Sequence, residues 1–240
     1  MIIEGKNPVK EALKSGQTIN KLMALNKLYD AESNEIITLA KEKGVFVTFS
    51  TKEVLDKASV SGKHQGFVAE VTDFEYSSVD DIIESAKSKG EPLFMVILDG
   101  IEDPHNFGAI VRSCECAGVH GIVIGKHRAC AVNDTVAKTS VGALSNMKIA
   151  RVTNINQEIL SLKKQGIWVY GAEADGESIY RTNLKGELAV VIGGEGDGVS
   201  ELTKKNCDGI ISLPLRGKIN SLNASVACGI VLFEALRQRL

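Results

Sequence analysis

Two uninterrupted apolar runs, each followed at once by a glycine-containing polar loop, constrain this chain more than any other feature. They are residues 93–98 (LFMVIL) and 188–192 (LAVVI). Runs of this kind are typical of strands buried on both faces, as in parallel sheets covered by helices. We therefore expect an α/β fold with a mostly parallel sheet. In such sheets, ligands bind outside the carboxyl ends of the strands.

The pattern continues on both sides of these runs. Further strands are predicted at residues 121–124, 167–171 and 210–213, and helices at 108–117 and 222–240. In the last helix the apolar residues fall on one stripe, which consists of Leu222, Val226, Ile230, Phe233 and Leu236. Residues 92–240 are therefore expected to form one domain.

The N-terminal part predicts a small α/β unit of its own. Helices are expected at residues 8–16 and 35–43, and strands at 19–25, 45–49 and 66–71. We place this unit at residues 1–74. The polar stretch 75–91, with a short helix at 79–86, is expected to be an interdomain linker.

Composition excludes several classes of protein. No apolar stretch reaches the ~18–20 residues of a membrane span, and the first residues lack the pattern of a secretory signal, so a cytoplasmic protein is the default expectation. The five cysteines are odd in number and lack metal-site spacing, so we expect reduced thiols and no metal. The net charge of −2 leaves a nucleic-acid partner open, because binding depends on a local basic patch.

The loop after the first apolar run opens a helix and carries Asn106 and Arg112. An arginine in an otherwise apolar helical turn is costly to bury without a partner. An arginine on the solvent side of the helix and an arginine in a site fit this spacing equally well.

The second apolar run leads into residues 193–200 (GGEGDGVS), whose four glycines allow the backbone to approach a ligand closely. The loop is not a dinucleotide fingerprint, because Val199 stands where the third glycine should be. This argues against a nucleotide-binding oxidoreductase. Glu195 and Asp197 are a poor lining for phosphates, so the loop suits a cationic or neutral ligand. A tight glycine turn without a ligand is the alternative.

A third segment, residues 212–227 (SLPLRGKINSLNASVA), leads from a strand through a polar loop into the last helix. Asn220, Ser221 and Asn223 cluster at the start of that helix, where they can cap free backbone N–H groups or hold a ligand. Three polar residues are more than a cap requires.

In this order, the three segments resemble the three motifs of the SpoU (TrmH-like) RNA methyltransferases, in the SPOUT superfamily. The matching stretches are residues 106–112 (NFGAIVR), 193–199 (GGEGDGV) and 212–227. Residues 3–13 (IEGKNPVKEAL) and 64–69 (HQGFVA) resemble the L30e-like substrate-binding domain of one branch. That branch is similar to the 23S ribosomal RNA guanosine 2′-O-methyltransferases.

The resemblance implies a fold, a cofactor and an assembly. It implies a C-terminal SPOUT domain with a trefoil knot, preceded by the L30e-like domain. S-adenosyl-L-methionine would sit bent in the knot, with Gly193, Leu213 and Leu222 against it. Gly194 and Gly198 of the same loop are expected to contribute to cofactor binding. Family members are homodimers, with the active site near the dimer interface.

The resemblance also assigns catalytic positions. Arg112 matches the catalytic arginine, and the other polar positions match Asn106, Glu195, Ser221 and Asn223. A ribose 2′-hydroxyl is a poor nucleophile, so aligning it with the methyl group is the main task. Guanidinium stays protonated in proteins. We therefore expect Arg112 to bind a phosphate and stabilise the developing alkoxide, with Glu195 and Asn106 orienting arginine and ribose.

RNA specificity is expected in the N-terminal domain, with 23S ribosomal RNA or an assembling large subunit as partner. The candidate phosphate contacts are Lys6, Lys10, Lys63, His64, Lys126, His127, Arg128, Arg216 and Lys218. Two alternatives stay open: a transfer RNA ribose methyltransferase, and a catalytically silent RNA-binding or ribosome-assembly protein. The full polar set argues against the silent protein, because binding alone would not need these residues together.

Overall fold

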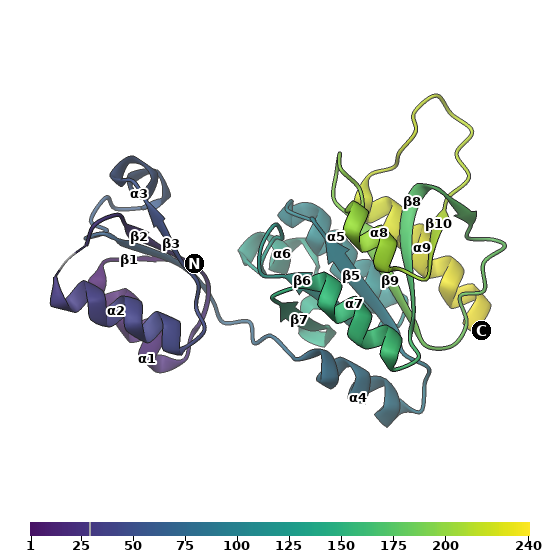
Figure 1. Ribbon diagram of the computed structural model, residues 1–240, viewed down its shortest axis with the longest axis horizontal. Helices are drawn as coiled ribbons and strands as arrows, with labels where there is room; N and C mark the ends of the chain where they lie inside the picture. The colour runs from purple at the N-terminus through teal and green to yellow at the C-terminus, as the bar shows by residue number, and fades with distance from the viewer. Residues whose placement is uncertain (29) are drawn as a thin grey trace. The chain divides into compact units, whose positions relative to one another are not determined.

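A computed structural model describes residues 1–28 and 30–240 and divides the chain into two compact units, Met1–Glu75 and Tyr76–Leu240 (Figure 1). Each unit has its own sheet and its own apolar core. The expected end of the first domain, residue 74, lies beside this boundary. Across the two described stretches, no helix combines the length and the apolarity that a membrane span needs.

The first unit is a four-stranded sheet in the order β1-β4-β2-β3, in which β4 runs antiparallel to both of its neighbours. Its strands are β1 (Ile2–Glu4), β2 (Thr18–Leu25), β3 (Val47–Ser50) and β4 (Phe67–Thr72), and its helices are α1 (Lys6–Ser15), α2 (Ala31–Glu42) and α3 (Lys52–Ala58). Apolar side chains of α1 and α2 pack on the sheet around the fully buried Leu22, Ile36 and Phe67. The sequence patterns missed only the short elements, β1 and α3.

The second unit is built on a six-stranded, entirely parallel sheet in the order β10-β8-β9-β5-β6-β7. The strands are β5 (Phe94–Asp99), β6 (Gly121–Gly125), β7 (Lys148–Val152), β8 (Trp168–Ser178), β9 (Leu188–Gly193) and β10 (Gly209–Ser212). This confirms the expected parallel α/β fold. The sequence patterns missed β7, an edge strand in which two charged residues interrupt the apolar ones.

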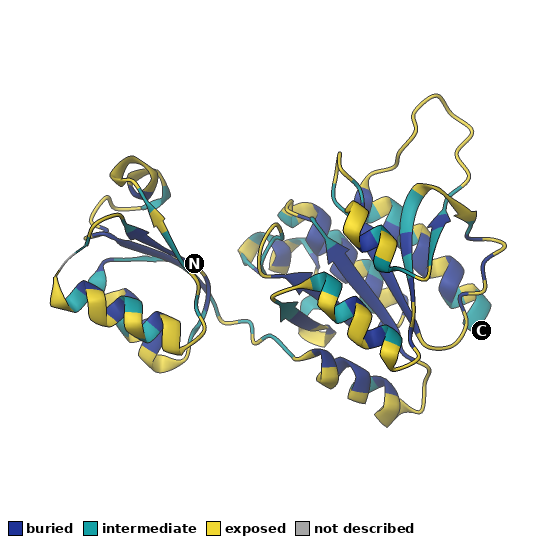
Figure 2. Ribbon diagram, viewed as in Figure 1, coloured by how far each residue is buried: buried dark blue, intermediate teal, exposed yellow. Residues whose placement is uncertain are grey.

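Helices cover both faces of this sheet (Figures 1 and 2). They are α4 (Val79–Lys89), α5 (Pro104–Cys116), α6 (Asp134–Thr139), α7 (Ile155–Lys164), α8 (Glu201–Asn206) and α9 (Ala224–Arg239), with a short 3₁₀ helix, η1 (Ala143–Asn146). Residues of α4 and α7 share one apolar cluster with alternate strand residues such as Met95 and Ile97. Helix α8 packs against α7, whereas α5 packs against α9 and α6.

The segment expected to be a linker is part of the second unit. Helix α4 begins with a capping box formed by Ser78 and Asp81, and it buries Ile82 and Ile83 in the cluster that contains Met95. The linker assignment is therefore wrong for residues 76–91. Although the stretch is polar on average, its four apolar residues recur at helical spacing, and burying them outweighs the mean composition.

Helix α9 turns a different face to the core than its apolar stripe suggested. Its buried residues include Cys228, Val231, Leu232 and Ala235. From the stripe, Val226 is 50 % exposed, Ile230 38 % and Phe233 51 %. Since α9 is apolar nearly all round, periodicity alone does not decide which side faces the sheet.

The last turn of α9 is fixed to the start of β5 by Arg239. Its guanidinium donates to the carbonyls of Pro92 (3.2 Å), Leu93 (3.2 Å) and Gly186 (2.6 Å), and it lies 4.5 Å from the ring centroid of Phe94. Arg239→Ala would leave these carbonyls without their charged donor. We expect a loss of about 2 kcal/mol of unfolding free energy, or ~4–8 °C in midpoint temperature, measured by thermal denaturation.

Lys164→Ala is a suitable control, because Lys164 is exposed in the last turn of α7. It should change the unfolding free energy by less than about 0.5 kcal/mol. Equal shifts in the two variants would contradict the role given to Arg239.

Candidate active site

The order of the strands reverses between β5 and β9, which creates a topological switch point. Strands β6 and β7 lie on one side of β5, and β9, β8 and β10 lie on the other. The pairing of Asp99 with Gly193 brings the loops after β5 and β9 together, and Gly194 N–H donates to the Asp99 carbonyl at 2.9 Å. A crevice at the carboxyl ends of two such strands is the usual ligand site of an open α/β sheet.

A cavity of about 550 Å³ lies between the 193–198 loop, the 211–224 segment and the middle of β8. It brings together all five residues expected to bind the cofactor: Gly193, Gly194, Gly198, Leu213 and Leu222. Glu195, Ser221 and Asn223, predicted as catalytic residues, also line this cavity. Glu173 lines it too, and its carboxylate accepts the N–H of Val199. Glu173 was missed because it lies far from the three motifs and inside a strand.

Gly193 has no room for a side chain. A Cβ at this position would lie 2.1 Å from the carbonyl carbon of Gly198 and 2.2 Å from the nitrogen of Val199. The loop folds back on β9 here, and Gly194 and Gly198 form a backbone bridge. Gly193 is therefore required for the close backbone approach that shapes the cavity wall.

Three predicted catalytic side chains form one hydrogen-bonded cluster, which we call the Asn-Glu-Asn cluster: Asn106, Glu195 and Asn223. Asn106 Nδ2 donates to Glu195 Oε1 at 2.8 Å, and Asn223 Nδ2 donates to the same oxygen at 2.8 Å and to Asn106 Oδ1 at 2.9 Å. Asn106 is 93 % buried, as its exposed fraction is 7 %. Two amide donors thus fix one carboxylate oxygen, and within residues 1–28 and 30–240 no hydrogen bond engages the other.

Helix starts position both asparagines. Helix α5 begins at Pro104, with Asp103 as its N-cap, four residues earlier than expected. This places Asn106 in the first turn, at the carboxyl edge of the sheet. Asn223 is the N-cap of α9, and its Oδ1 accepts the N–H groups of Ser225 (3.0 Å) and Val226 (3.3 Å). The same side chain therefore serves as cap and as site residue.

Arg112 lies apart from this cluster. It is exposed on α5, and among residues 1–28 and 30–240 no hydrogen bond or ion pair joins it to another residue. The expectation that Glu195 and Asn106 orient Arg112 is therefore not met within one chain. Six residues after Asn106, Arg112 points from a different side of the helix.

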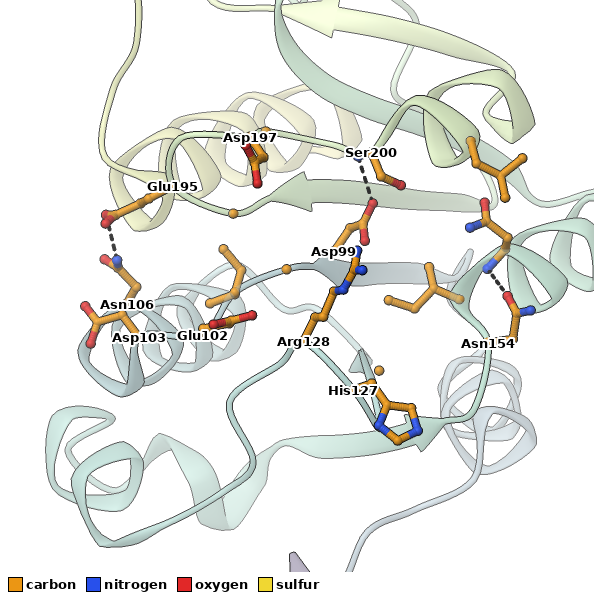
Figure 3. A pocket seen from close by; sticks show the side chains of 18 of the residues that line it. Asp99, Glu102, Asp103, Asn106, His127, Arg128, Asn154, Glu195, Asp197 and Ser200 are labelled. Atoms are coloured by element: carbon orange, nitrogen blue, oxygen red, sulfur yellow. Dashed lines mark hydrogen bonds between the residues drawn. The ribbon is translucent and has the colours of Figure 1, made fainter. Parts of the chain in front are cut away.

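A second cavity, of about 790 Å³, opens on the other side of the 193–200 loop (Figure 3). Its walls come from the loops after β5, β6, β7 and β9, and they include Asp99, Asn106, Arg128, Asn154 and Glu195. Ser200 N–H donates to Asp99 Oδ2 at 3.0 Å. The motif residues Asn106 and Glu195 line this cavity, but Arg128 and Asn154 come from loops outside the three motifs, so the motifs did not predict its full wall.

The candidate phosphate contacts of the first unit are mostly engaged within that unit. Lys6 and Lys10 each form an ion pair of 2.7 Å, with the N-cap of α2 and with a glutamate of α2. His64 is 5 % exposed, its Nε2 lies 3.0 Å from an aspartate of α3, and its Nδ1 accepts the N–H of Gly66. His64 is therefore a structural residue, and its assignment as a phosphate contact is wrong.

The remaining candidates are exposed. They are Lys63, Lys126, His127, Arg128, Arg216 and Lys218.

The cysteines are free thiols, as expected. Burial raises the pKa of Cys207 to about 11 and that of Cys114 well above its usual value, so both stay protonated near neutral pH. In the part of the chain that the structure describes, no group of three or more His, Cys, Asp or Glu residues is placed to hold a metal ion.

Both units match known families. The family model described as "SpoU rRNA Methylase family" matches residues 93–233, and the model "RNA 2′-O ribose methyltransferase substrate binding" matches residues 2–77. A relative from Bacillus subtilis, "Putative TrmH family tRNA/rRNA methyltransferase YacO", is 44 % identical over 98 % of this chain and 94 % of its own length. A Staphylococcus haemolyticus protein, "Putative TrmH family tRNA/rRNA methyltransferase", is 43 % identical over 100 % of this chain and 96 % of its own.

Solved structures share the fold. The SpoU methyltransferase AviRb from Streptomyces viridochromogenes, in complex with AdoMet, aligns with a TM-score of 0.63 at 22 % identity, covering 99 % of this chain and 90 % of AviRb. An AdoMet-bound rRNA methyltransferase from Sinorhizobium meliloti aligns with a TM-score of 0.61 at 22 % identity, covering 100 % of this chain and 87 % of that one. Together, the two family models and the relatives at 43–44 % identity show that this chain belongs to the SpoU rRNA methylase family.

Proposed function

We propose that this protein transfers the methyl group of S-adenosyl-L-methionine to the 2′-oxygen of a ribose in RNA, with a guanosine of 23S ribosomal RNA as its target. The observation that carries the proposal is the Asn-Glu-Asn cluster at the wall of the glycine-lined cavity. A silent binding protein would have no need of a fixed carboxylate there. The trefoil knot that the resemblance implies stays a prediction.

The cavity suits the cofactor. Gly193 and Gly194 present backbone instead of side chains, while Leu213 and Leu222 supply apolar contact. Glu173, with Glu195 and Asp197 of the loop, surrounds the cavity with carboxylates, which favour a ligand of positive charge. When bound, S-adenosyl-L-methionine supplies a methyl group on a positively charged sulfur. The AviRb and Sinorhizobium meliloti structures, which share the fold, were solved with this cofactor.

The chain's own residues then have to hold the ribose and balance charge. Glu195 is fixed through Oε1, so its Oε2 is free to accept a hydrogen bond from the ribose hydroxyl and hold it in line. Ser221, at the same cavity, can donate to the ribose. Arg112 binds the adjacent phosphate and stabilises the negative charge that develops on the 2′-oxygen.

The position of Arg112 supports action in a homodimer. Helices α5 and α9 are in contact at Ser113 and Gly229: a Cβ added to Gly229 would lie 3.7 Å from Ser113 Oγ. Arg112, which precedes Ser113, and Ile230, which follows Gly229, are both exposed. The exposed apolar side chains of α9 therefore lie on a helix that packs against the one that carries Arg112, and a second copy that covers them would come close to that helix. We include this homodimer in the proposal.

Ile230→Asp tests the homodimer. A carboxylate in an apolar interface cannot be desolvated without a partner, so we expect the variant to be a monomer with methyl transfer reduced at least tenfold. Sedimentation velocity gives the oligomeric state. Leu160→Asp is the matched control, because Leu160 is a 46 % exposed leucine on α7. A wild-type monomer, or an Ile230→Asp dimer with full activity, would contradict this arrangement.

The proposed function is tested with methyl-labelled S-adenosyl-L-methionine and separated, unmodified ribosomal and transfer RNA. Products are digested and the 2′-O-methyl nucleoside is identified. Label in a large-subunit guanosine supports the proposal. The relatives named "tRNA/rRNA methyltransferase" favour transfer RNA as the second candidate substrate. Label in transfer RNA alone would show that transfer RNA, and not ribosomal RNA, is the substrate. Absence of both label and cofactor binding would favour the silent RNA-binding protein.

A further inference from the structure

The second cavity adjoins the cofactor cavity and shares Gly194, Glu195, Asp197 and Gly198 with it. A ligand there would reach the same fixed carboxylate, Glu195, from the side opposite the cofactor cavity. At about 790 Å³, the cavity lies within the range of small-ligand sites, about 300–1,000 Å³. It is therefore large enough for a single nucleotide turned out of an RNA strand.

The walls differ in chemistry from one part to the next. Ile155 and Leu202 supply apolar surface, which suits the faces of a base. His127 and Arg128, from the loop after β6, are exposed at the cavity and suit a phosphate. This combination of apolar surface and cationic side chains is that of a nucleotide site rather than of a metal site.

Asp99 is the side chain in this cavity that is best placed to recognise the base. It stands at the end of β5 and is half-buried, and the Ser200 N–H fixes its Oδ2 at 3.0 Å. Figure 3 shows the other oxygen directed away from this hydrogen bond, on the side where Arg128 lies. A carboxylate offers about four lone-pair sites, so Asp99 retains acceptor capacity in a fixed orientation.

We propose that this cavity binds the target nucleoside and that Asp99 recognises its base as guanine, an inference that rests on the proposed function. The Watson–Crick edge of guanine carries two adjacent donors, N1–H and the exocyclic amino group, and a carboxylate accepts both. Adenine and cytosine each present an acceptor nitrogen beside their amino group. Uracil presents one donor between two carbonyl oxygens. A carboxylate therefore repels part of each of these edges.

Asp99→Asn tests the assignment with little change in structure. The asparagine Oδ1 still accepts the Ser200 N–H, while an amino group replaces the oxygen that faces the base. The probes are guanosine and adenosine 5′-monophosphate, titrated calorimetrically into the protein with S-adenosylhomocysteine present. We expect the wild type to prefer the guanine nucleotide. We expect the variant to bind it at least about tenfold more weakly, with adenosine monophosphate and cofactor affinities within twofold.

Glu201→Gln is the matched control, because it also removes one negative charge, and Glu201 is exposed at the start of α8 and lines neither cavity. A twofold effect or less there, beside the tenfold effect at Asp99, supports the proposal. Equal losses in both variants, equal losses for both nucleotides, or no loss in Asp99→Asn would overturn it.

Failure of this inference and failure of the proposed function give different results. Guanine-selective binding that depends on Asp99, without methyl transfer to any RNA, keeps the nucleotide site and removes the proposed reaction. Methyl transfer to a ribose whose base is not guanine, unaffected by Asp99→Asn, keeps the reaction and overturns the guanine site.

Discussion

Arg112→Ala is expected to slow methyl transfer by a factor of about 10²–10³, the typical effect of removing one donor that stabilises a developing oxyanion. Arg112 is exposed and makes no hydrogen bond or ion pair in the described residues, so its loss should leave the fold intact. Single-turnover transfer of labelled methyl to RNA measures the chemical step. Calorimetry should show unchanged cofactor affinity.

Arg181→Ala is the matched control, since Arg181 is also exposed but lies in the segment between β8 and β9 instead of on α5. Its rate should stay within twofold of the wild type. Arg112→Lys keeps the charge but loses the planar pair of donors, and we expect an intermediate rate. Near-normal turnover of Arg112→Lys at raised pH would show that electrostatic stabilisation alone does not describe the role of Arg112. A rate within threefold in Arg112→Ala would remove the residue from the mechanism.

Gly193→Ala is expected to abolish measurable cofactor binding and to destabilise the second unit. The added Cβ would meet backbone atoms of Gly198 and Val199 at 2.1 and 2.2 Å, and backbone cannot turn away as a side chain can. Overpacking of this kind costs about 3 kcal/mol or more, which is roughly 6–12 °C in the unfolding midpoint. Calorimetric titration of S-adenosyl-L-methionine and thermal denaturation measure the two effects.

The comparison for this variant is Gly217→Ala, in the loop between β10 and α9. The nearest atom to its added Cβ is the nitrogen of Ile219 at 3.9 Å, an ordinary contact. We expect a change of less than about 0.5 kcal/mol in stability. If Gly193→Ala binds the cofactor as the wild type does, the cavity described here is not the cofactor site.

Sequence patterns were sufficient for the parts of the fold that depend on local signals. The buried runs at 93–98 and 188–192 predicted β5 and β9, and the polar loops after them predicted the position of the site. Helix α4 was expected to belong to a linker because its stretch is polar on average, although its apolar residues form a regular stripe. The buried face of α9 was not predictable, since a helix that is apolar all round gives no direction, and its packing against α5 and β9 decides which side is buried.

The sequence predicted which residues belong to the candidate site but not the contacts between them. Asn106, Glu195 and Asn223 lie in three motifs far apart in the chain, and only the fold shows that they bond to one another. Arg112 is not part of the cluster that these three residues form, and the spacing of residues in the sequence could not have shown this. Asp99 was hidden for a further reason: an aspartate that ends a buried strand is expected at any strand-to-loop transition.

Asn223 makes the Asn-Glu-Asn cluster sensitive to local opening at the start of α9. One end of its amide holds the first turn of α9, and the other holds Glu195. Helix ends open locally at a much lower free energy than the whole domain unfolds. Each opening of this turn therefore removes one of the two amide donors that fix the Glu195 carboxylate, so methyl transfer should decline on warming before the protein unfolds. Hydrogen exchange at the Ser225 and Val226 amides would report the fraction of molecules with an ordered site.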